Sequence, residues 1–255
     1  MRSGEQAARE LAHHEDLYSG HAQEYFAKNA VRQFRRHLVE RIVQRTGLGP
    51  GSRVLSLGCG IGDTEILLAK RVGHVTGVDL SPRGIAQAQS DAAVAGTANT
   101  TFEVMKSDTA DFGAGRFDAV LGIFFLHHLA AGELAAFPGR SRAWLRPGGC
   151  FYGLDPNRRR LSGALGRIFV PRLMARYQTP DERQLLAGEV AAIFRLGGFD
   201  VQTALYDFVS TPLAGLCPAW GAGYRAARIV DEVLIRTPLL RSAGSNFEVV
   251  ARSPR

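Results

Sequence analysis

The chain has 255 residues, of which 45% are hydrophobic, and it carries a net charge of +7 at pH 7. No run of eighteen or more apolar residues is present, so the sequence predicts no transmembrane helix. Three widely separated cysteines without a Cys-x-x-Cys pair argue against both a metal site and a disulfide framework. We therefore expect one domain over residues 1–255, with no resident metal.

The positive charge comes mainly from arginines that cluster near residues 32–36 and 158–176. These clusters fit an arginine-rich composition without a function, contact with an anionic membrane or lipid, or nucleic-acid binding. Nucleic acid is the least favoured partner because no aromatic-interleaved platform is visible. The first residues also lack the apolar stretch of a secretory signal. We expect a cytoplasmic protein and keep peripheral membrane contact as an alternative.

A helical segment is predicted at residues 11–46. Apolar residues recur there at helical spacing, and the pattern is typical of an amphipathic helix: Val31, Phe34, Leu38, Ile42 and Val43. Aromatic residues and histidines precede this stripe, including Tyr18, His21 and Tyr25. The segment therefore places chemically useful side chains just before the first predicted strand.

The most informative stretch follows this helix. A short apolar run at Val54–Leu57 ends at Gly58, Gly60 and Gly62, and residues 64–72 are then predicted as a helix. A strand, a tight turn and a helix N-terminus form the arrangement in which backbone N–H groups approach a polar ligand closely. Dinucleotide folds use the different spacing Gly-x-Gly-x-x-Gly.

A second strand, His74–Asp79, ends in an acid and is followed by Leu80, Ser81 and Pro82. In a mononucleotide-binding βαβ unit, an acid at this place accepts hydrogen bonds from both ribose hydroxyls. Pro82 suits the first turn of the next helix. Further strands are predicted at residues 101–105, 116–122, 145–155, 199–206 and 247–252, and a further helix at residues 224–235.

Five segments of residues 50–155 occur in the order seen in one enzyme superfamily. They are the glycine triplet, the acid Asp79, the run Lys106–Thr109, the stretch from Phe117 to the His-His-Leu at 127–129, and the turn and strand of residues 145–155. Together they resemble class I S-adenosylmethionine (SAM) dependent methyltransferases of the small-molecule type. The resemblance implies a seven-stranded, mostly parallel α/β sheet with an antiparallel last strand and helices on both faces.

The resemblance also implies roles for the residues of the cofactor-binding half, 50–155. The three glycines hold the methionine part of SAM, Asp79 holds the ribose, and Asp108 and Thr109 lie at the adenine, although Asp108 can also simply begin a turn. Tyr18 and Tyr25 are candidates to close over the cofactor, with core packing as the alternative. The remaining predicted cofactor-binding positions are Ser56, Cys59, Leu80 and Ile123.

One position departs from the family pattern. The family usually has an acid two residues before the first glycine, where it orients the methionine amino group, and this chain has Ser56. A hydroxyl brings no charge to pair with an ammonium group. We expect weaker SAM binding or an acid from elsewhere, with Asp63 the nearest candidate. A protein that binds SAM without transferring a methyl group is the alternative.

Three histidines are candidates for a general base. Methyl transfer needs the acceptor to be placed behind the methyl carbon, and it needs a base only when the acceptor must lose a proton. His127 and His128 follow the fourth strand, near the expected position of the methyl group, and His21 lies in the N-terminal segment. Helix packing is the competing interpretation for the pair, and catalysis by proximity alone needs none of the three.

Two insertions, residues 157–180 and 207–243, leave from the carboxyl ends of predicted parallel strands, where ligands of open α/β sheets bind. Both can form helical caps whose apolar side chains lie beside arginines. This combination favours a small, partly apolar or lipid-like acceptor, methylated at oxygen, nitrogen or carbon, and membrane docking by the same helices competes with it.

Other classes of protein remain as alternatives to a small-molecule methyltransferase. They are an NAD(P) oxidoreductase, an aminopropyl transferase, an RNA or protein methyltransferase, and a non-catalytic scaffold. The acceptor motif Asn/Asp-Pro-Pro-Tyr/Phe of many base or glutamine methyltransferases is absent, because residues 122–125 read Gly-Ile-Phe-Phe. The oligomeric state stays open.

Overall fold

The structure is a computed structural model that describes residues 11, 12, 15, 18, 21–106, 111–163, 183–237, 240 and 242–255, the side chains of residues 21–23 excepted. Helices lie between most of its consecutive strands, as a doubly wound sheet requires. In order they are α2 (His21–Phe26), α3 (Asn29–Thr46), β1 (Arg53–Leu57), α4 (Asp63–Leu68), β2 (His74–Asp79), α5 (Pro82–Val94), β3 (Thr100–Val104), β4 (Phe117–Ile123), the 3-10 turn η1 (Leu126–His128), α6 (Ala131–Trp144), β5 (Leu145–Pro156), α9 (Ala187–Leu196), β6 (Asp200–Asp207), α10 (Ser210–Leu216), α11 (Gly221–Leu234) and β7 (Asn246–Arg252).

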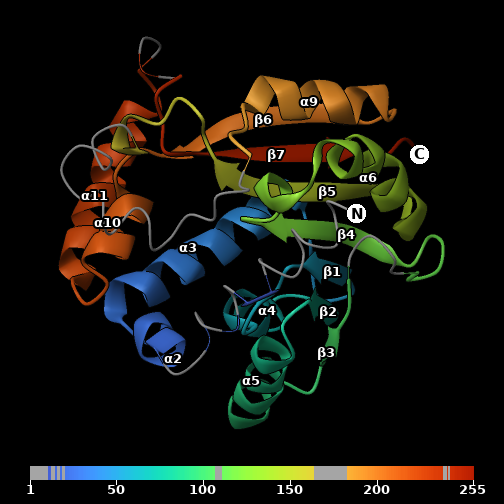
Figure 1. The fold of residues 1–255 in the computed structure, drawn as a ribbon, viewed down its shortest axis with the longest axis horizontal. Helices are drawn as coiled ribbons and strands as arrows, with labels where there is room; N and C mark the ends of the chain where they lie inside the picture. Colours follow the sequence, from blue (N-terminus) through green and yellow to red (C-terminus); the bar gives the residue numbers. More distant parts are fainter. Residues whose placement is uncertain are drawn as a thin grey trace.

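The described strands form one seven-stranded sheet in the order β3-β2-β1-β4-β5-β7-β6 (Figure 1). Strand β7 runs antiparallel to both β5 and β6, and the other pairs are parallel. The predicted mixed sheet is therefore confirmed. The chain order reverses between β1 and β4, which is the switch point at which open α/β sheets bind their ligands.

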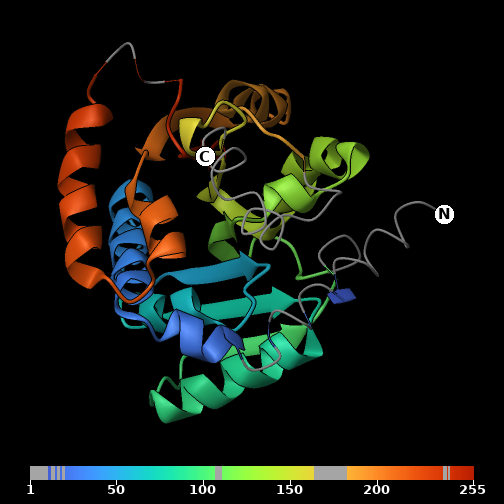
Figure 2. The ribbon, with the colours of Figure 1, turned by 60° about the vertical axis from the view of Figure 1, so that its left-hand side comes forward.

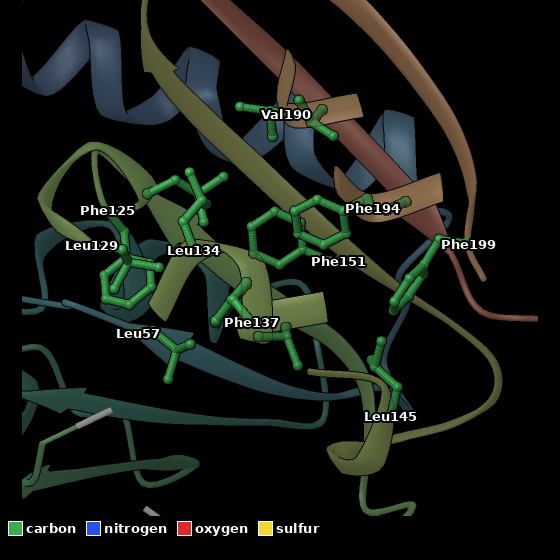
Figure 3. Close-up of a cluster of buried hydrophobic side chains, with 14 of the residues drawn as sticks. Leu57, Phe125, Leu129, Leu134, Phe137, Leu145, Phe151, Val190, Phe194 and Phe199 are labelled. Atoms are coloured by element: carbon green, nitrogen blue, oxygen red, sulfur yellow. The ribbon is translucent and has the colours of Figure 1, made fainter. Parts of the chain in front are cut away.

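Strand β1 lies in the middle of the sheet and has a core on each face. Leu55 and Leu57 belong to a cluster with side chains of α6 and α9, whereas Val54 belongs to a second cluster with side chains of α3 and α4. The alternation follows from the two-residue period of a strand. Figure 3 shows the first cluster, in which Phe137 and Phe194 meet Phe151 of the sheet.

Helix α3 confirms the amphipathic stripe of the N-terminal segment, because Val31, Phe34, Leu38 and Ile42 are all buried. It ends at Gly47, whose φ of 77° lies in the left-handed region that favours glycine. The helix packs against α4 on one side and against α10 and α11 on the other. Through its contact with α4, helix α3 brings the N-terminal segment next to the glycine loop that follows β1.

Helix α4 is shorter than the sequence predicts, because it ends at Leu68 and not near residue 72. The side-chain amide of Asn99 donates hydrogen bonds to the carbonyls of Ala69 and Val72, at 2.8 and 3.1 Å. A residue thirty positions away thus binds carbonyls of the segment that follows the end of the helix. Helical periodicity within the segment carries no sign of this tertiary contact.

The two predicted cap segments differ in how far they are described. Residues 164–182 lie outside the described residues. The second segment contains α10 and α11, which lie alongside α3 in Figure 2, and the amide of Ala30 donates to the carbonyl of Pro218 at 2.8 Å. The cap role of both segments stays a prediction. In the described part of the chain, no helix is both long enough and apolar enough to cross a membrane.

The glycine at position 62 provides a test of the packing around β1. Gly62 has a φ of +71°, and an added Cβ would lie 2.8 Å from Phe102 and 2.9 Å from Ala88. Gly96 has a similar φ of +64° but nothing within 4 Å of an added Cβ. We expect Gly96→Ala to destabilise the protein by about 1–2 kcal/mol through backbone strain. Gly62→Ala should cost the same strain and about 1–3 kcal/mol more, because its added Cβ overpacks the core.

Urea denaturation of the two variants and the wild type measures both costs. Equal losses of unfolding free energy in the two variants would contradict the packing that we assign to Gly62.

Candidate cofactor site and its comparison with known proteins

The loop between β1 and α4 is built from glycines in the left-handed region. Gly58, Gly60 and Gly62 have φ values of +66°, +54° and +71°. Residues with a Cβ adopt such angles at a cost, and a Cβ would also block the approach of another molecule to the backbone. The loop leads directly into the N-terminus of α4, where an anionic or polar ligand group is stabilised.

The Asp79 carboxylate ties this loop to the end of β2. One of its oxygens accepts a hydrogen bond from the Gly60 amide at 2.8 Å, and the other accepts from the Ser81 amide at 2.9 Å. Ser81 in turn caps α5, since its hydroxyl accepts from the Gly84 amide at 2.9 Å. The predicted ribose-binding acid is thus buried and held in one orientation beside the glycine loop.

Two residues of the N-terminal segment lie beside this site: Tyr18 at the glycine loop and the start of α5, and Glu15 at the start of α5. An added Cβ on Gly60 would lie 2.5 Å from the Tyr18 hydroxyl, and one on Gly84 would lie 3.2 Å from the Tyr18 ring. Burial and the nearby Asp79 raise the pKa of Tyr18, so its hydroxyl stays protonated. Glu15 accepts hydrogen bonds from the Ser81 hydroxyl and the Arg83 amide, and the Ser81 bond lowers the pKa of Glu15.

Tyr25, the second aromatic residue predicted to close over the cofactor, lies in a different environment. Its hydroxyl is 3.8 Å from the position of a Cβ on Gly215 of α10, and its ring packs edge-on against Phe26 at 5.4 Å. The structure therefore brings Tyr18 to the glycine loop and Tyr25 to α10.

The serine at the family's acid position has a carboxylate partner. The Ser56 hydroxyl donates to Glu65 of α4 at 2.6 Å, and Glu65 is only 2% exposed. Burial raises the pKa of Glu65 to about 7. Asp63, the acid nearest in sequence to the glycines, instead forms an ion pair with Arg35 at 2.6 Å. Glu65 was not predicted as a site residue from the sequence, although it is an acid that directly precedes the apolar run of residues 66–68.

The two histidines after β4 differ in exposure and contacts. His127 is buried, and its Nδ1 lies 2.8 Å from Asp155 Oδ1, which also accepts from the His127 amide at 3.2 Å. His128 is half-buried, and its ring lies 4.1 Å from the His127 ring. Burial raises the pKa of Asp155 to about 8. The Asp155 contact fixes the orientation of the His127 ring.

Several predicted positions lie at the edge of the site or outside the described residues. Ile123 and Leu80 are partly exposed at the ends of β4 and β2. Cys59 is buried. Its sulfur would lie 3.0 Å from a Cβ added at Gly77, so the space between these two positions admits only small side chains. Asp108, Thr109 and the side chain of His21 lie outside the described residues.

Phe124, next to Ile123, is the one described residue other than glycine with a positive φ, at 53°. A strained residue at the carboxyl end of a central strand is typical of a functional site. Among the described residues, no group of three or more His, Cys, Asp or Glu side chains forms a possible metal site.

Comparison with known proteins agrees with this geometry. Residues 54–149 match the family model described as "Methyltransferase domain". The chain is 27% identical to an uncharacterized methyltransferase of Synechocystis sp. over 162 residues, which are 62% of this chain and 72% of that protein. It is 30% identical to the ubiquinone biosynthesis O-methyltransferase of Methylobacterium sp. over 178 residues, which are 67% of this chain and 70% of that protein.

A similar fold occurs in phosphoethanolamine N-methyltransferase 2 of Haemonchus contortus, solved in complex with SAM. The TM-score is 0.62 at 18% sequence identity, over 86% of this chain and 53% of that chain. The glycine loop, the sheet order and these similarities lead to one conclusion: the chain belongs to the class I SAM-dependent methyltransferases, enzymes whose cofactor is SAM.

Proposed function

We propose that the protein transfers the methyl group of SAM to a small, partly apolar or lipid-like acceptor, at an oxygen, nitrogen or carbon atom. The observation that carries the proposal is the Asp79 carboxylate, which is buried and fixed beside the glycine loop at the switch point of the sheet. The similarity to a ubiquinone biosynthesis O-methyltransferase supports a small acceptor with an apolar part.

The residues of the loop fit SAM. Gly58, Gly60 and Gly62, which adopt left-handed angles, are assigned to the methionine part by the family pattern. A carboxylate has about four acceptor sites, and backbone amides use two of those on Asp79, so acceptor capacity remains for the ribose hydroxyls. Asp108 and Thr109 are assigned to the adenine by the family pattern. SAM supplies an electrophilic methyl group on a sulfonium.

Tyr18 covers the site from the N-terminal side. Its half-buried side chain lies against Gly60 and Gly84, and Glu15 holds the same segment to Ser81. Excluding water from the site strengthens the electrostatic interactions of a charged cofactor. Tyr18 is therefore the better candidate of the two tyrosines for closing over the cofactor.

His128 is the better candidate for a general base when the acceptor must lose a proton. It is half-buried at the carboxyl end of β4, whereas His127 is buried and its Nδ1 is engaged by Asp155. In this assignment His127 is a positioning residue, because its ring packs against the ring of His128. Histidine is suited to this role because its ordinary pKa lies near neutrality.

Replacement of Asp79 tests the assignment of the ribose site. Asp79→Ala should raise the dissociation constant for SAM by one to two orders of magnitude, about 1.4–2.8 kcal/mol. Isothermal titration measures the constant. Asp200→Ala, which removes an exposed acid at the start of β6, should leave it unchanged. An Asp79→Ala protein that binds SAM like the wild type would remove Asp79 from the site.

Replacement of the two histidines separates a base from a packing residue. We expect His128→Ala to lower turnover by about 10²–10⁴-fold with little change in thermal stability, as loss of a general base does. His127→Ala should lower the melting temperature, because it removes the side-chain partner of the buried Asp155. Turnover and thermal unfolding are measured on both variants. If the loss of stability in His128→Ala accounts for its lost activity, His128 is a packing residue.

Helix α11 has a surface that favours the competing interpretation, contact of the protein with an anionic membrane. Ile229 and Val233 are 70% and 64% exposed on α11, and Arg225 and Arg236 lie on or next to the same helix. Exposed apolar side chains beside cationic ones are typical of helices that lie on anionic membranes.

Co-sedimentation with anionic vesicles at physiological salt tests this contact. The wild type should pellet, and Ile229→Asp should reduce the bound fraction because a charge replaces buried apolar contact. Leu196→Asp is a matched control, since Leu196 is 90% exposed at the end of α9. Absence of the wild type from the pellet, or equal losses in both variants, would reject membrane docking through α11.

A further inference from the structure

A buried carboxylate stands beside the residue that replaces the family's acid. Ser56 is the last residue but one of β1, and Glu65 lies in the first turn of α4. The 2.6 Å hydrogen bond between them joins the two ends of the glycine loop. The carboxylate of Glu65 is thereby held at the base of the loop, against the side chain at the family's acid position.

One oxygen of this carboxylate lacks a partner. Ser56 donates to Oε1 of Glu65, whereas Oε2 is buried and has no hydrogen-bond partner among the described residues. An unsatisfied buried carboxylate oxygen is costly, and in a native structure it calls for an explanation such as a ligand or ion. A packing role for Glu65 provides none, because an uncharged side chain would fill the same volume without this cost.

The surroundings of Glu65 favour a cationic group from a ligand. Asp63 lies in the same helix turn, Cys59 lies in the loop, and both interact electrostatically with Glu65. Arg35 of α3 also interacts electrostatically with Glu65, but its Nε forms the ion pair with Asp63. The described surroundings thus contain two carboxylates and one arginine, so an additional positive charge would be stabilised there.

We propose that Glu65 binds the amino group of the methionine part of SAM, in place of the acid that the family carries at position 56. The carboxylate has been moved from β1 to α4, and Ser56 now orients it. This inference rests on the proposed function, because it needs SAM in the glycine loop. It removes the expectation that Ser56 deprives the site of a negative charge.

Burial makes the proposed contact dependent on pH. The pKa of Glu65 is raised to about 7 by burial, is raised further by Asp63, and is lowered by Ser56 and Arg35. The native protein therefore holds a proton on Glu65 between pH 4.5 and 7 that the unfolded chain releases. This contribution to stability is present below pH 4.5 and is lost as the pH rises to 7. An ammonium group favours the ionised form, so its binding should strengthen over the same range.

The test compares two ligands on the full-length protein by isothermal titration between pH 5.5 and 7.5. S-adenosylhomocysteine carries the amino group, and 5′-methylthioadenosine lacks both the amino and the carboxyl group. We expect Glu65→Gln to weaken S-adenosylhomocysteine binding about 10–100-fold at pH 7.5, the loss of a charge-assisted hydrogen bond. Binding of 5′-methylthioadenosine should be unchanged. The wild-type affinity for S-adenosylhomocysteine should rise with pH, and this rise should vanish in Glu65→Gln.

A swapped variant guards against a merely structural effect. Ser56→Asp combined with Glu65→Ser returns the acid to β1 and should restore S-adenosylhomocysteine binding to within about 10-fold of the wild type, since the charge is present again. Equal losses for both ligands in Glu65→Gln, or an unchanged affinity for S-adenosylhomocysteine, would overturn the role of Glu65. If the wild type binds neither ligand, the proposed function itself fails.

Discussion

The site depends on the hydrogen bond by which the Gly60 amide donates to the Asp79 carboxylate. The three glycines of the loop adopt left-handed angles that are open to few other residues, and its remaining side chains, Cys59 and Ile61, are buried. The parallel register pairs Leu57 of β1 with Val78 of β2, so the next residue, Asp79, arrives level with the loop. One carboxylate thereby fixes the loop and presents acceptors to a ligand at the same place.

The electrostatic character of the site differs from that of the whole chain. The protein carries a net charge of +7, yet the glycine loop is surrounded by the carboxylates of Asp63, Glu65 and Asp79, with Arg35 as the basic partner of one of them. SAM carries positive charge on its sulfonium and its amino group. A site lined by carboxylates suits such a ligand, although the protein as a whole is basic.

The fold could be predicted from the sequence because it is encoded locally. The short apolar runs, the glycine triplet and the acid ending β2 placed the strands near their observed positions, and the resemblance supplied the antiparallel last strand. What escaped prediction depends on contacts between distant residues. Asn99 binds carbonyls of the segment that follows α4, and Asp155 fixes His127 from 28 positions away.

Glu65 shows why part of the site could not be predicted. Proximity in sequence to the glycines favoured Asp63, but the turn of α4 directs Glu65 inward to Ser56 and leaves Asp63 to pair with Arg35 of α3. Neighbours along a helix point in different directions, so the Ser56 hydroxyl meets Glu65 and not Asp63. The position of α3 relative to α4, which decides this pairing, is set by packing and not by local pattern.

Isothermal titration of the purified wild-type protein with SAM, with NADH as the control, tests the central claim most directly. The arrangement of the glycine loop, Asp79 and Glu65 predicts micromolar binding of SAM and no binding of NADH. Absence of SAM binding would contradict the account, and the protein would then be better described as a scaffold that has kept the methyltransferase fold without its cofactor.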